Sequence, residues 1–252
     1  RHAIVCLAGF SEFASRLTRR DVGIYDLEKS PGKEFGAYYR LFRLLRRLQP
    51  SIVHTRNIGT LDCQLAAFLA CVPCRVHGEH GWDIDDLDGC SGKYVWFRRL
   101  SRALVHKYVV VSKHMTGWLQ DVVGIPGKKV VQIYNGIDTV RFAPAQGAFS
   151  ASSPLANDEA EKFVVGTVGR LDPIKDHVTL IEGFARFIDD LPCPEQSIRL
   201  VIVGDGETRE ELQRLIASKG LHSVVSLPGA TDNVPEVLRG LDVFVLSSLN
   251  EG

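Results

Sequence analysis

A chain of 252 residues with 45% apolar and 24% charged residues has ordinary globular composition and enough length for two domains. It contains no run near the roughly 20 apolar residues that cross a bilayer. Its six cysteines are too sparse for a disulfide scaffold and it lacks an Asn-x-Ser/Thr sequon, which favours a reducing cytosol. The zero net charge conceals a split, because residues 1–150 hold 21 Lys/Arg and 13 Asp/Glu whereas residues 151–252 hold 9 and 17. That split predicts two bodies with different partners.

Short β-branched runs recur along the whole chain. Several are apolar without alternation, as expected for strands covered on both faces. The predicted strands are residues 3–7, 51–54, 75–77, 108–111, 130–133, 163–168, 200–203, 224–227 and 243–246.

Helical patterns separate most of these strands. They cover residues 39–48, 61–70, 115–122, 179–188, 209–219 and 234–239. Alternation of strands and helices predicts an α/β protein of Rossmann-like type, with parallel sheets joined by right-handed crossovers. Ligands of such sheets bind beyond the carboxyl ends of strands, so we look for functional residues there.

The alternation is interrupted once, at residues 143–162. This stretch is rich in Ala, Ser, Pro and Asn and shows no periodicity, which indicates a linker or an insertion at a domain boundary. We therefore predict one Rossmann-like domain at residues 1–142, a linker at 143–162 and a second such domain at 163–252.

Two cations follow the strand at residues 163–168. The strand ends at Gly169, the next loop carries Arg170 and Lys175, and Asp176 is placed to cap the following helix. An arginine fork and a lysine point charge beside a glycine suit a diphosphate. A solvated loop with no ligand is the alternative interpretation.

Two further strands run into polar loops. Gly204-Asp205-Gly206 follows one strand, where glycines let the backbone turn tightly and approach a ligand, although a plain tight turn explains the pattern equally well. Glu251 lies just beyond the last predicted strand, where a carboxylate can accept sugar hydroxyl protons. A helix N-cap region is the alternative there.

These segments, taken in order, resemble the donor-binding domain of glycosyltransferase family 4, group 1, a family with the GT-B fold of two Rossmann-like domains. Upstream, Val109-Val110-Val111-Ser112 and the segment from Ile133 to Pro144 resemble the close of that family's acceptor-side domain. The segments from His54 to Asn57 and from His77 to Asp83 are similar to sugar transferases of bacterial exopolysaccharide clusters. The resemblance covers nearly the whole chain.

The resemblance implies roles for individual residues. Arg170 and Lys175 hold the diphosphate of a nucleotide-sugar donor and stabilise its charge as it leaves, without a metal. Glu251 is the first carboxylate of a Glu-x7-Glu motif near the transferred sugar, and His80 reaches that sugar from the other domain. His77 is a weaker candidate for the same role. The expected nucleotide pocket is lined by Gly169, Gly204, Asp205, Gly206, Leu227 and Gly229.

The family implies a retaining glycosyltransferase that moves a sugar from a nucleotide-sugar donor to a glycan or lipid-linked acceptor in exopolysaccharide biosynthesis. The same fold serves sugar-nucleotide 2-epimerases, and an inactive nucleotide-sugar-binding fragment is a further alternative. A Gly-rich loop after the first strand is missing, and the second Glu of the motif would lie beyond Gly252. These departures predict a chain that is cut at both ends, and they leave open whether it is active in isolation. The sequence also does not specify the donor nucleotide, the sugar, the acceptor or the linkage formed.

Neither a metal nor another cofactor is expected, because the nucleotide sugar is a substrate. The acidic cluster from Asp83 to Asp88 contains Asp-x-Asp pairs, yet it fails the spacing of a calcium loop and is better explained as a solvated or acceptor-side loop. Cys71 and Cys74 have metal-like spacing without a second pair, which favours buried small hydrophobes.

Basic residues gather in two places. Arg40, Arg43 and Arg47 share one face, and Arg98, Arg99, Arg102, His106 and Lys107 follow three aromatic residues. These cations are suited to anionic lipid head groups, although ordinary exposed helices explain the first set about as well. We expect a cytoplasmic protein, with peripheral membrane contact as one option, and no nucleic-acid partner.

Overall fold

The computed structural model describes residues 2–11, 14–15, 17–19, 21–32, 34–82, 86–144, 162–189, 191–192 and 198–251. Most of the predicted linker and the first three residues of the acidic cluster lie outside this part of the chain. Within it, the residues divide into two compact units. The first unit holds residues 2–82 and 88–134, and the second holds residues 86–87 and 135–251, apart from the gaps just given.

The first unit alternates strands and helices. It begins with two strands and a long helix, continues as strand–helix pairs, and ends on a short strand. Its elements are β1 (His2–Cys6), β2 (Val22–Asp26), α1 (Phe35–Leu48), β3 (Ile52–Arg56), the 3-10 helix η2 (Ile58–Thr60), α2 (Cys63–Leu69), β4 (Cys74–Glu79), α3 (Gly92–Ser101), β5 (Lys107–Val110), α4 (Lys113–Asp121), η4 (Gly127–Lys129) and β6 (Val130–Gln132).

Its strands form two parallel sheets. One has the order β3-β4-β5-β6, and β1 pairs with β2 in a separate two-stranded sheet. A single core nevertheless joins them, because Val5, Tyr25 and Val53 pack against the same cluster of α1 and α2 side chains. The strand predicted at 3–7 is thus present, but β2 and α3 were not predicted.

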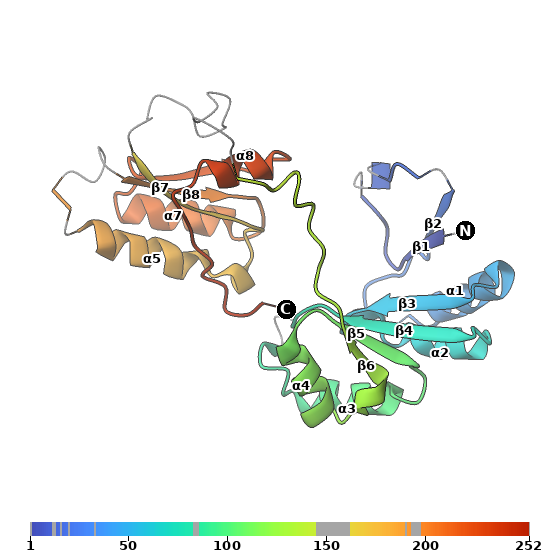
Figure 1. The fold of residues 1–252 in the computed structure, drawn as a ribbon. Helices are drawn as coiled ribbons and strands as arrows, with labels where there is room; N and C mark the ends of the chain where they lie inside the picture. The colour runs from blue at the N-terminus through green and yellow to red at the C-terminus, as the bar shows by residue number, and fades with distance from the viewer. Residues whose placement is uncertain are drawn as a thin grey trace. The chain divides into compact units, whose positions relative to one another are not determined.

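The second unit holds one parallel sheet of order β10-β7-β8-β9. Figure 1 shows α5 and α7 on one side of β7 and β8 and α8 on the other. The elements are β7 (Phe163–Val168), η5 (Pro173–Lys175), α5 (His177–Ile188), β8 (Ile198–Val203), α7 (Arg209–Ser218), β9 (Val225–Gly229), α8 (Val234–Arg239) and β10 (Val243–Phe244).

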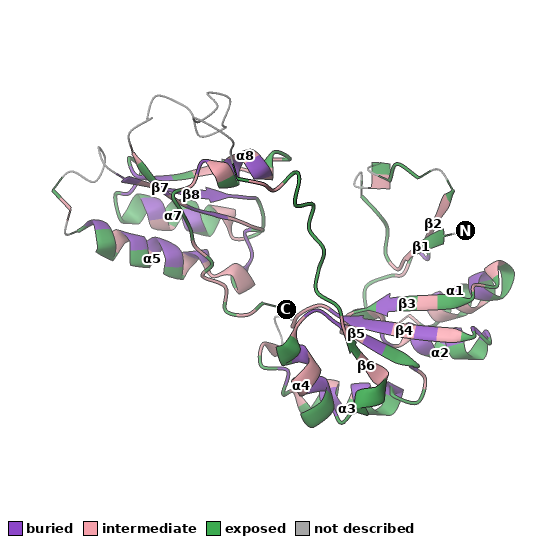
Figure 2. Ribbon diagram, viewed as in Figure 1, coloured by how far each residue is buried: buried purple, intermediate pink, exposed green. Residues whose placement is uncertain are grey.

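Successive residues of β8 explain why this sheet is covered on both faces. Leu200 and Ile202 pack in the cluster formed by α5 and α7, whereas Val201 and Val203 pack with Val237 of α8. Side chains alternate across a strand, so a continuous apolar run supplies two cores at once. Figure 2 shows the resulting buried residues along β8, and along β4 and β5 in the first unit.

The predicted elements are recovered with shifted ends. The last strand is shorter than 243–246, since β10 stops at Phe244, while β9 extends past Leu227 to Gly229. Leu227 therefore lies within a strand, not at its end. Among the described residues, no helix combines the length and the apolar character that crossing a bilayer requires.

Candidate functional site

The loop after β7 is built by local hydrogen bonds. The Gly169 amide donates to Val203 O of β8 at 3.0 Å, which extends the sheet by one residue. The Asp172 carboxylate accepts from the Lys175 amide and caps η5, and Asp176, at a left-handed φ of 44°, caps α5 through the Thr179 amide. These caps fix the backbone that carries both predicted cations.

The two cations differ in their surroundings. The Arg170 side chain is 80% exposed, and among the described residues its ion-pair partner is the Asp172 carboxylate, at 2.7 Å. Lys175 is largely covered, and its Nζ lies 2.5 Å from Oε1 of Glu251. The Arg170 guanidinium thus exposes N–H groups to solvent, whereas the Lys175 ammonium already neutralises the Glu251 carboxylate.

Glu251 is held beside β7 by the chain that follows β10. The Ser247 hydroxyl donates to Lys175 O at 2.8 Å, and the Ser248 hydroxyl donates to Glu251 Oε1 at 2.6 Å. Burial by itself raises the pKa of Glu251, but hydrogen bonds from Lys175 and Ser248 outweigh it and hold the pKa below its usual value. Glu251 is therefore an ionised acceptor for hydroxyl groups at neutral pH.

Gly204 and Gly206 let the loop after β8 lie directly against the loop after β7. A Cβ on Gly204 would meet Gly169 O at 1.8 Å, and one on Gly206 would meet Leu171 O at 2.3 Å. The Leu171 amide donates to Asp205 O at 3.0 Å between the same loops. The glycines thus serve backbone packing here, and the loop they shape carries Asp205 at its surface.

Arg209 is a residue that the sequence did not single out. It begins α7, and its guanidinium donates to Leu227 O at 2.9 Å and to Gly204 O at 3.5 Å. It also lies 3.8 Å from the Asp205 carboxylate. Arg209 ties the ends of β8 and β9 together. The signal in the sequence that could have identified Arg209 is its position about one helical turn after Gly204 and Gly206.

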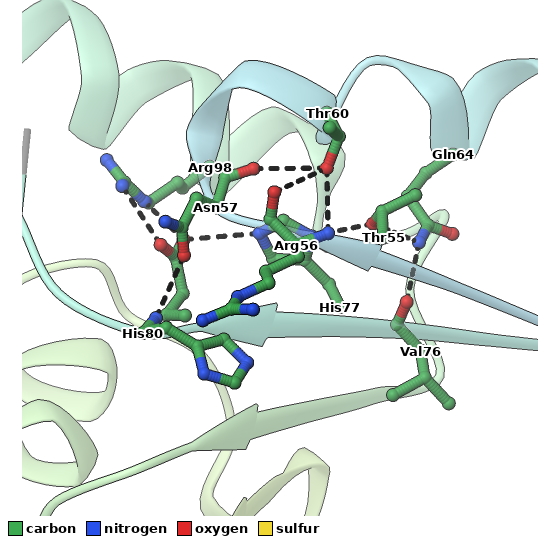
Figure 3. Close-up of polar contacts among 10 residues, drawn as sticks. Thr55, Arg56, Asn57, Thr60, Gln64, Val76, His77, His80 and Arg98 are labelled. Carbon is green, nitrogen blue, oxygen red and sulfur yellow. Dashed lines mark hydrogen bonds and ion pairs between the residues drawn. The ribbon is translucent and has the colours of Figure 1, made fainter. Parts of the chain in front are cut away.

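In the first unit, His80 follows β4 and is held through its backbone. Its amide donates to Asn57 Oδ1 at 3.0 Å, and Asn57 has a left-handed φ of 59°. Figure 3 shows the His80 ring and the Arg56 side chain extending from the ends of neighbouring strands. Within the described chain, neither ring nitrogen of His80 has a hydrogen-bond partner. Burial lowers the pKa of His80, and Arg56 and His54 lower it further, so the ring is neutral at pH 7.

His77 is placed quite differently. It is fully buried, its Nδ1 lies 2.7 Å from the Thr55 hydroxyl, and its Nε2 lies 3.3 Å from Glu79. Gln64 donates to Thr55 at 2.7 Å (Figure 3). Both ring nitrogens are used, so His77 has no donor left for a ligand. Its role is structural.

Glu79 is the buried charge that this network surrounds. Arg98 of α3 donates to both of its carboxylate oxygens, at 2.7 and 3.2 Å. Burial raises the pKa of Glu79, but the hydrogen bonds from His77 and Arg98 prevail and keep it below its usual value. The ion pair fixes the strand end from which His80 emerges.

The described residues contain no group of three or more His, Cys, Asp or Glu side chains suited to a metal ion. Residues 83–85 of the acidic cluster lie outside the described part, so the Asp-x-Asp pairs are not placed.

Sequence comparison then places the chain among known proteins. The model of Glycosyltransferase Family 4 matches residues 1–141, more than half of the sequence. The chain belongs to glycosyltransferase family 4. A second model, Glycosyl transferases group 1, matches residues 153–252. The family predicted from the motifs is confirmed.

Curated relatives of this family-4 chain include bacterial glycosyltransferases. It is 30% identical to the Escherichia coli UDP-Gal:alpha-D-GlcNAc-diphosphoundecaprenol alpha-1,3-galactosyltransferase over 224 residues, covering 87% of this chain and 57% of the relative. It is also 30% identical to the Bacillus subtilis protein EpsF, named a glycosyltransferase, covering 80% and 52%. The chain therefore spans little more than half the length of these relatives.

Solved structures show the same fold. The Anabaena protein Alr3699/HepE, in complex with UDP and glucose, matches with a TM-score of 0.78 at 19% identity, covering 98% of this chain and 67% of that one. A glycosyltransferase from Rickettsia africae matches with a TM-score of 0.72 at 16% identity, covering 98% and 64%. These matches confirm the predicted α/β fold with parallel sheets.

Proposed function

We propose that this family-4 protein is a retaining glycosyltransferase that transfers a sugar from a nucleotide sugar to a lipid-linked or glycan acceptor in exopolysaccharide biosynthesis. Residues 163–252 form the donor-binding domain and residues 1–142 the acceptor-side domain. The contact of Lys175 with Glu251 carries the proposal, because it brings a phosphate-binding cation and a sugar-binding carboxylate together at one sheet edge. Parallel α/β sheets bind ligands at that edge.

The relatives support this assignment. The HepE structure is a complex with UDP and glucose, and the name of the E. coli relative specifies a UDP-sugar donor and a diphosphoundecaprenol acceptor. The exopolysaccharide role rests on the resemblance of the segments His54–Asn57 and His77–Asp83 to sugar transferases of bacterial exopolysaccharide clusters. We propose a UDP-sugar as the donor to be tested first.

The proposed chemistry is electrostatic. A departing nucleoside diphosphate concentrates negative charge, and fixed cations can stabilise that charge in the transition state without a metal. Arg170 presents an exposed guanidinium before η5, and Lys175 presents an ammonium at the end of η5. The loops after β8 and β9, shaped by Gly204, Gly206 and Gly229, line the nucleotide side.

Retention follows from the family and from the placement of carboxylates. Glu251 is held by Lys175 and Ser248 as a hydroxyl acceptor, a role that positions the sugar. We propose that the leaving phosphate takes the acceptor's proton on the face from which it departs. His80, neutral and with unpartnered ring nitrogens, then positions a sugar hydroxyl from the acceptor-side domain.

A peripheral membrane location is part of the proposal. Lipid-linked acceptors lie in a bilayer, and helices α1 (Phe35–Leu48) and α3 (Gly92–Ser101) together carry six Lys or Arg residues besides the buried Arg98, and neither helix contains Asp or Glu. Clusters of this kind are attracted to anionic lipids by roughly 1 kcal/mol per cation near the surface.

Binding of UDP to this chain in buffer with EDTA tests the donor site. We expect Arg170→Ala and Lys175→Ala each to weaken binding by about ten- to a hundredfold, since a hydrogen bond to a charged group contributes roughly 1.5–3 kcal/mol. Lys219→Ala, at an exposed lysine after α7, is the matched control and should leave binding unchanged. Equal binding by all three variants, or binding only with added Mn²⁺, would show that the assigned site is wrong.

A further inference from the structure

A large apolar groove lies in the first unit, walled by α1, α2 and α3. Its volume is about 1040 Å³, at the upper end of the roughly 300–1,000 Å³ typical of small-molecule sites. Aromatic side chains of α1 and α3, including Tyr39 and Trp96, form two walls, and Leu65 and Leu69 of α2 form the third. The donor-binding loops contribute nothing to it.

Several large apolar side chains that line the groove are exposed, because no other described part of the first unit covers them. Phe35 is 82% exposed, Tyr39 62%, Trp96 63% and Leu69 57%. Contiguous exposed apolar surface of this size marks a binding site in a folded protein, whereas single exposed hydrophobic residues are normal. The aromatic walls therefore indicate a binding site for an apolar ligand.

Charge around the groove favours a ligand with an anionic head. Lys93 lines it, and the exposed Arg43 lies on α1. The two acids in the lining are already engaged, since Glu34 pairs with Arg40 and Asp62 accepts from the Tyr38 hydroxyl. A lipid with a neutral head group would leave these cations unused.

One end of the groove adjoins the loop that holds His80. Ile58 and Gly59 line the groove and directly follow Asn57, whose Oδ1 accepts the His80 amide. Arg56, exposed, precedes Asn57 at the carboxyl end of β3. A chain lying in the groove would thus bring its head group to Arg56 and the His80 side chain.

We propose that this groove binds the hydrocarbon chain of the acceptor, an isoprenoid whose diphosphate faces Arg56 and Lys93. The inference rests on the proposed glycosyl transfer and names the acceptor class that the reaction uses. The occupant is one hydrocarbon chain, and its apolar contacts come from α1, α2 and α3. The diphosphate head explains the cations, and the sugar beyond it reaches His80.

Farnesyl diphosphate is a water-soluble probe of this site. It is titrated by calorimetry into the whole chain with excess UDP, so that the donor loops are already occupied. We expect saturable binding, with inorganic pyrophosphate at least tenfold weaker because it lacks the buried chain. Leu65→Gln and Leu69→Gln should weaken farnesyl diphosphate binding about tenfold, since a polar amide replaces apolar surface in the groove. The matched control is Leu100→Gln, an exposed leucine of α3 outside the lining.

The outcomes separate this inference from the donor site. If farnesyl diphosphate fails to bind, or if L65Q, L69Q and L100Q bind it equally, the groove is not an isoprenoid site, whatever UDP does. If the chain binds anionic phosphatidylglycerol vesicles but not the probe, the face is a general membrane surface. Self-association that L65Q abolishes would instead show an interface between copies. If UDP fails to bind while farnesyl diphosphate binds as expected, the proposed donor site is wrong and the proposed isoprenoid groove is supported.

Discussion

Lys175 and Glu251 lie 76 residues apart in the sequence, yet Nζ and Oε1 are separated by 2.5 Å. A diphosphate that binds Lys175 must compete with this carboxylate. UDP lacks the sugar that Glu251 is proposed to bind, so removing the carboxylate charge only frees Lys175 for the diphosphate. Glu251→Gln should therefore tighten UDP binding about two- to fivefold, because a partly exposed ion pair contributes roughly 0–1 kcal/mol. Sugar transfer by the full-length protein should fall at the same time, since a sugar contact is lost.

The control for this prediction is Glu236→Gln. It removes a carboxylate that pairs with Arg239 on α8 in the same unit and should leave UDP affinity unchanged. Calorimetry with UDP checks both variants. Weaker UDP binding by E251Q would mean that Glu251 supports the diphosphate directly and would contradict the assigned division of roles.

The Arg98–Glu79 pair is the second residue-level test. Arg98→Met leaves a carboxylate buried without its counter-charge, which typically costs 3–5 kcal/mol. Adding Glu79→Gln should restore part of that loss, and Arg43→Met, at an exposed site on α1, should change the free energy of unfolding by less than about 0.5 kcal/mol. Urea denaturation measures all of them. An R98M variant as stable as R43M would show that the pair does not hold the strand end.

At the scale of elements, the β7 and β8 loops pack through glycine. Gly204→Ala should destabilise the second unit by about 1–3 kcal/mol, because the new methyl group overlaps Gly169 O. Gly183→Ala is the same change on the exposed face of α5, where no atom lies within 4 Å of the new Cβ, and it should stabilise by about 0.5–1 kcal/mol. The urea midpoint should therefore fall in the Gly204→Ala variant and rise in the Gly183→Ala variant. Equal effects would mean that the loops are not in contact in solution.

Helix α5 begins with a buried histidine that predicts a pH dependence. Burial lowers the pKa of His177 below its ordinary value of 6.5. The unfolded chain then binds more protons than the folded chain as pH falls below 6.5, so stability is complete above that pH and is lost on acidification. Thermal unfolding between pH 7.5 and 5.5 should show this decline, with a shallower slope in His177→Gln. A flat or rising stability on acidification would contradict it.

The elements that could be predicted from the sequence are those with one dominant signal. The apolar run of β8 and the caps of α5 are local features, so both were found. Helix α3 was missed because Trp96 and Leu100 face outward and blur its apolar stripe. Strand β2 was missed because Gly23 and flanking charges weaken its pattern.

Over the whole molecule, Arg170, Lys175 and Glu251 were proposed from their places after strands, His80 was proposed through the family resemblance, and the contacts of these residues come only from the fold. The Lys175–Glu251 contact depends on β10 pairing with β7, a crossover that no local pattern encodes. The distinction between His77 and His80 depends on burial, since both are histidines in one short segment. The contact of Arg209 with Leu227 depends on the pairing of β8 with β9, so Arg209 was not found.

The central claim concerns the whole protein, which is glycosyl transfer with retention and without a metal. The most direct measurement is proton NMR of the product that the full-length protein makes from an α-linked UDP-sugar and a lipid diphosphate acceptor in the presence of EDTA. We predict an α-linked glycoside, formed at an undiminished rate. A β-linked product would contradict retention, activity that returns only with Mn²⁺ would contradict metal independence, and a free epimerised sugar nucleotide in place of any glycoside would contradict transfer itself.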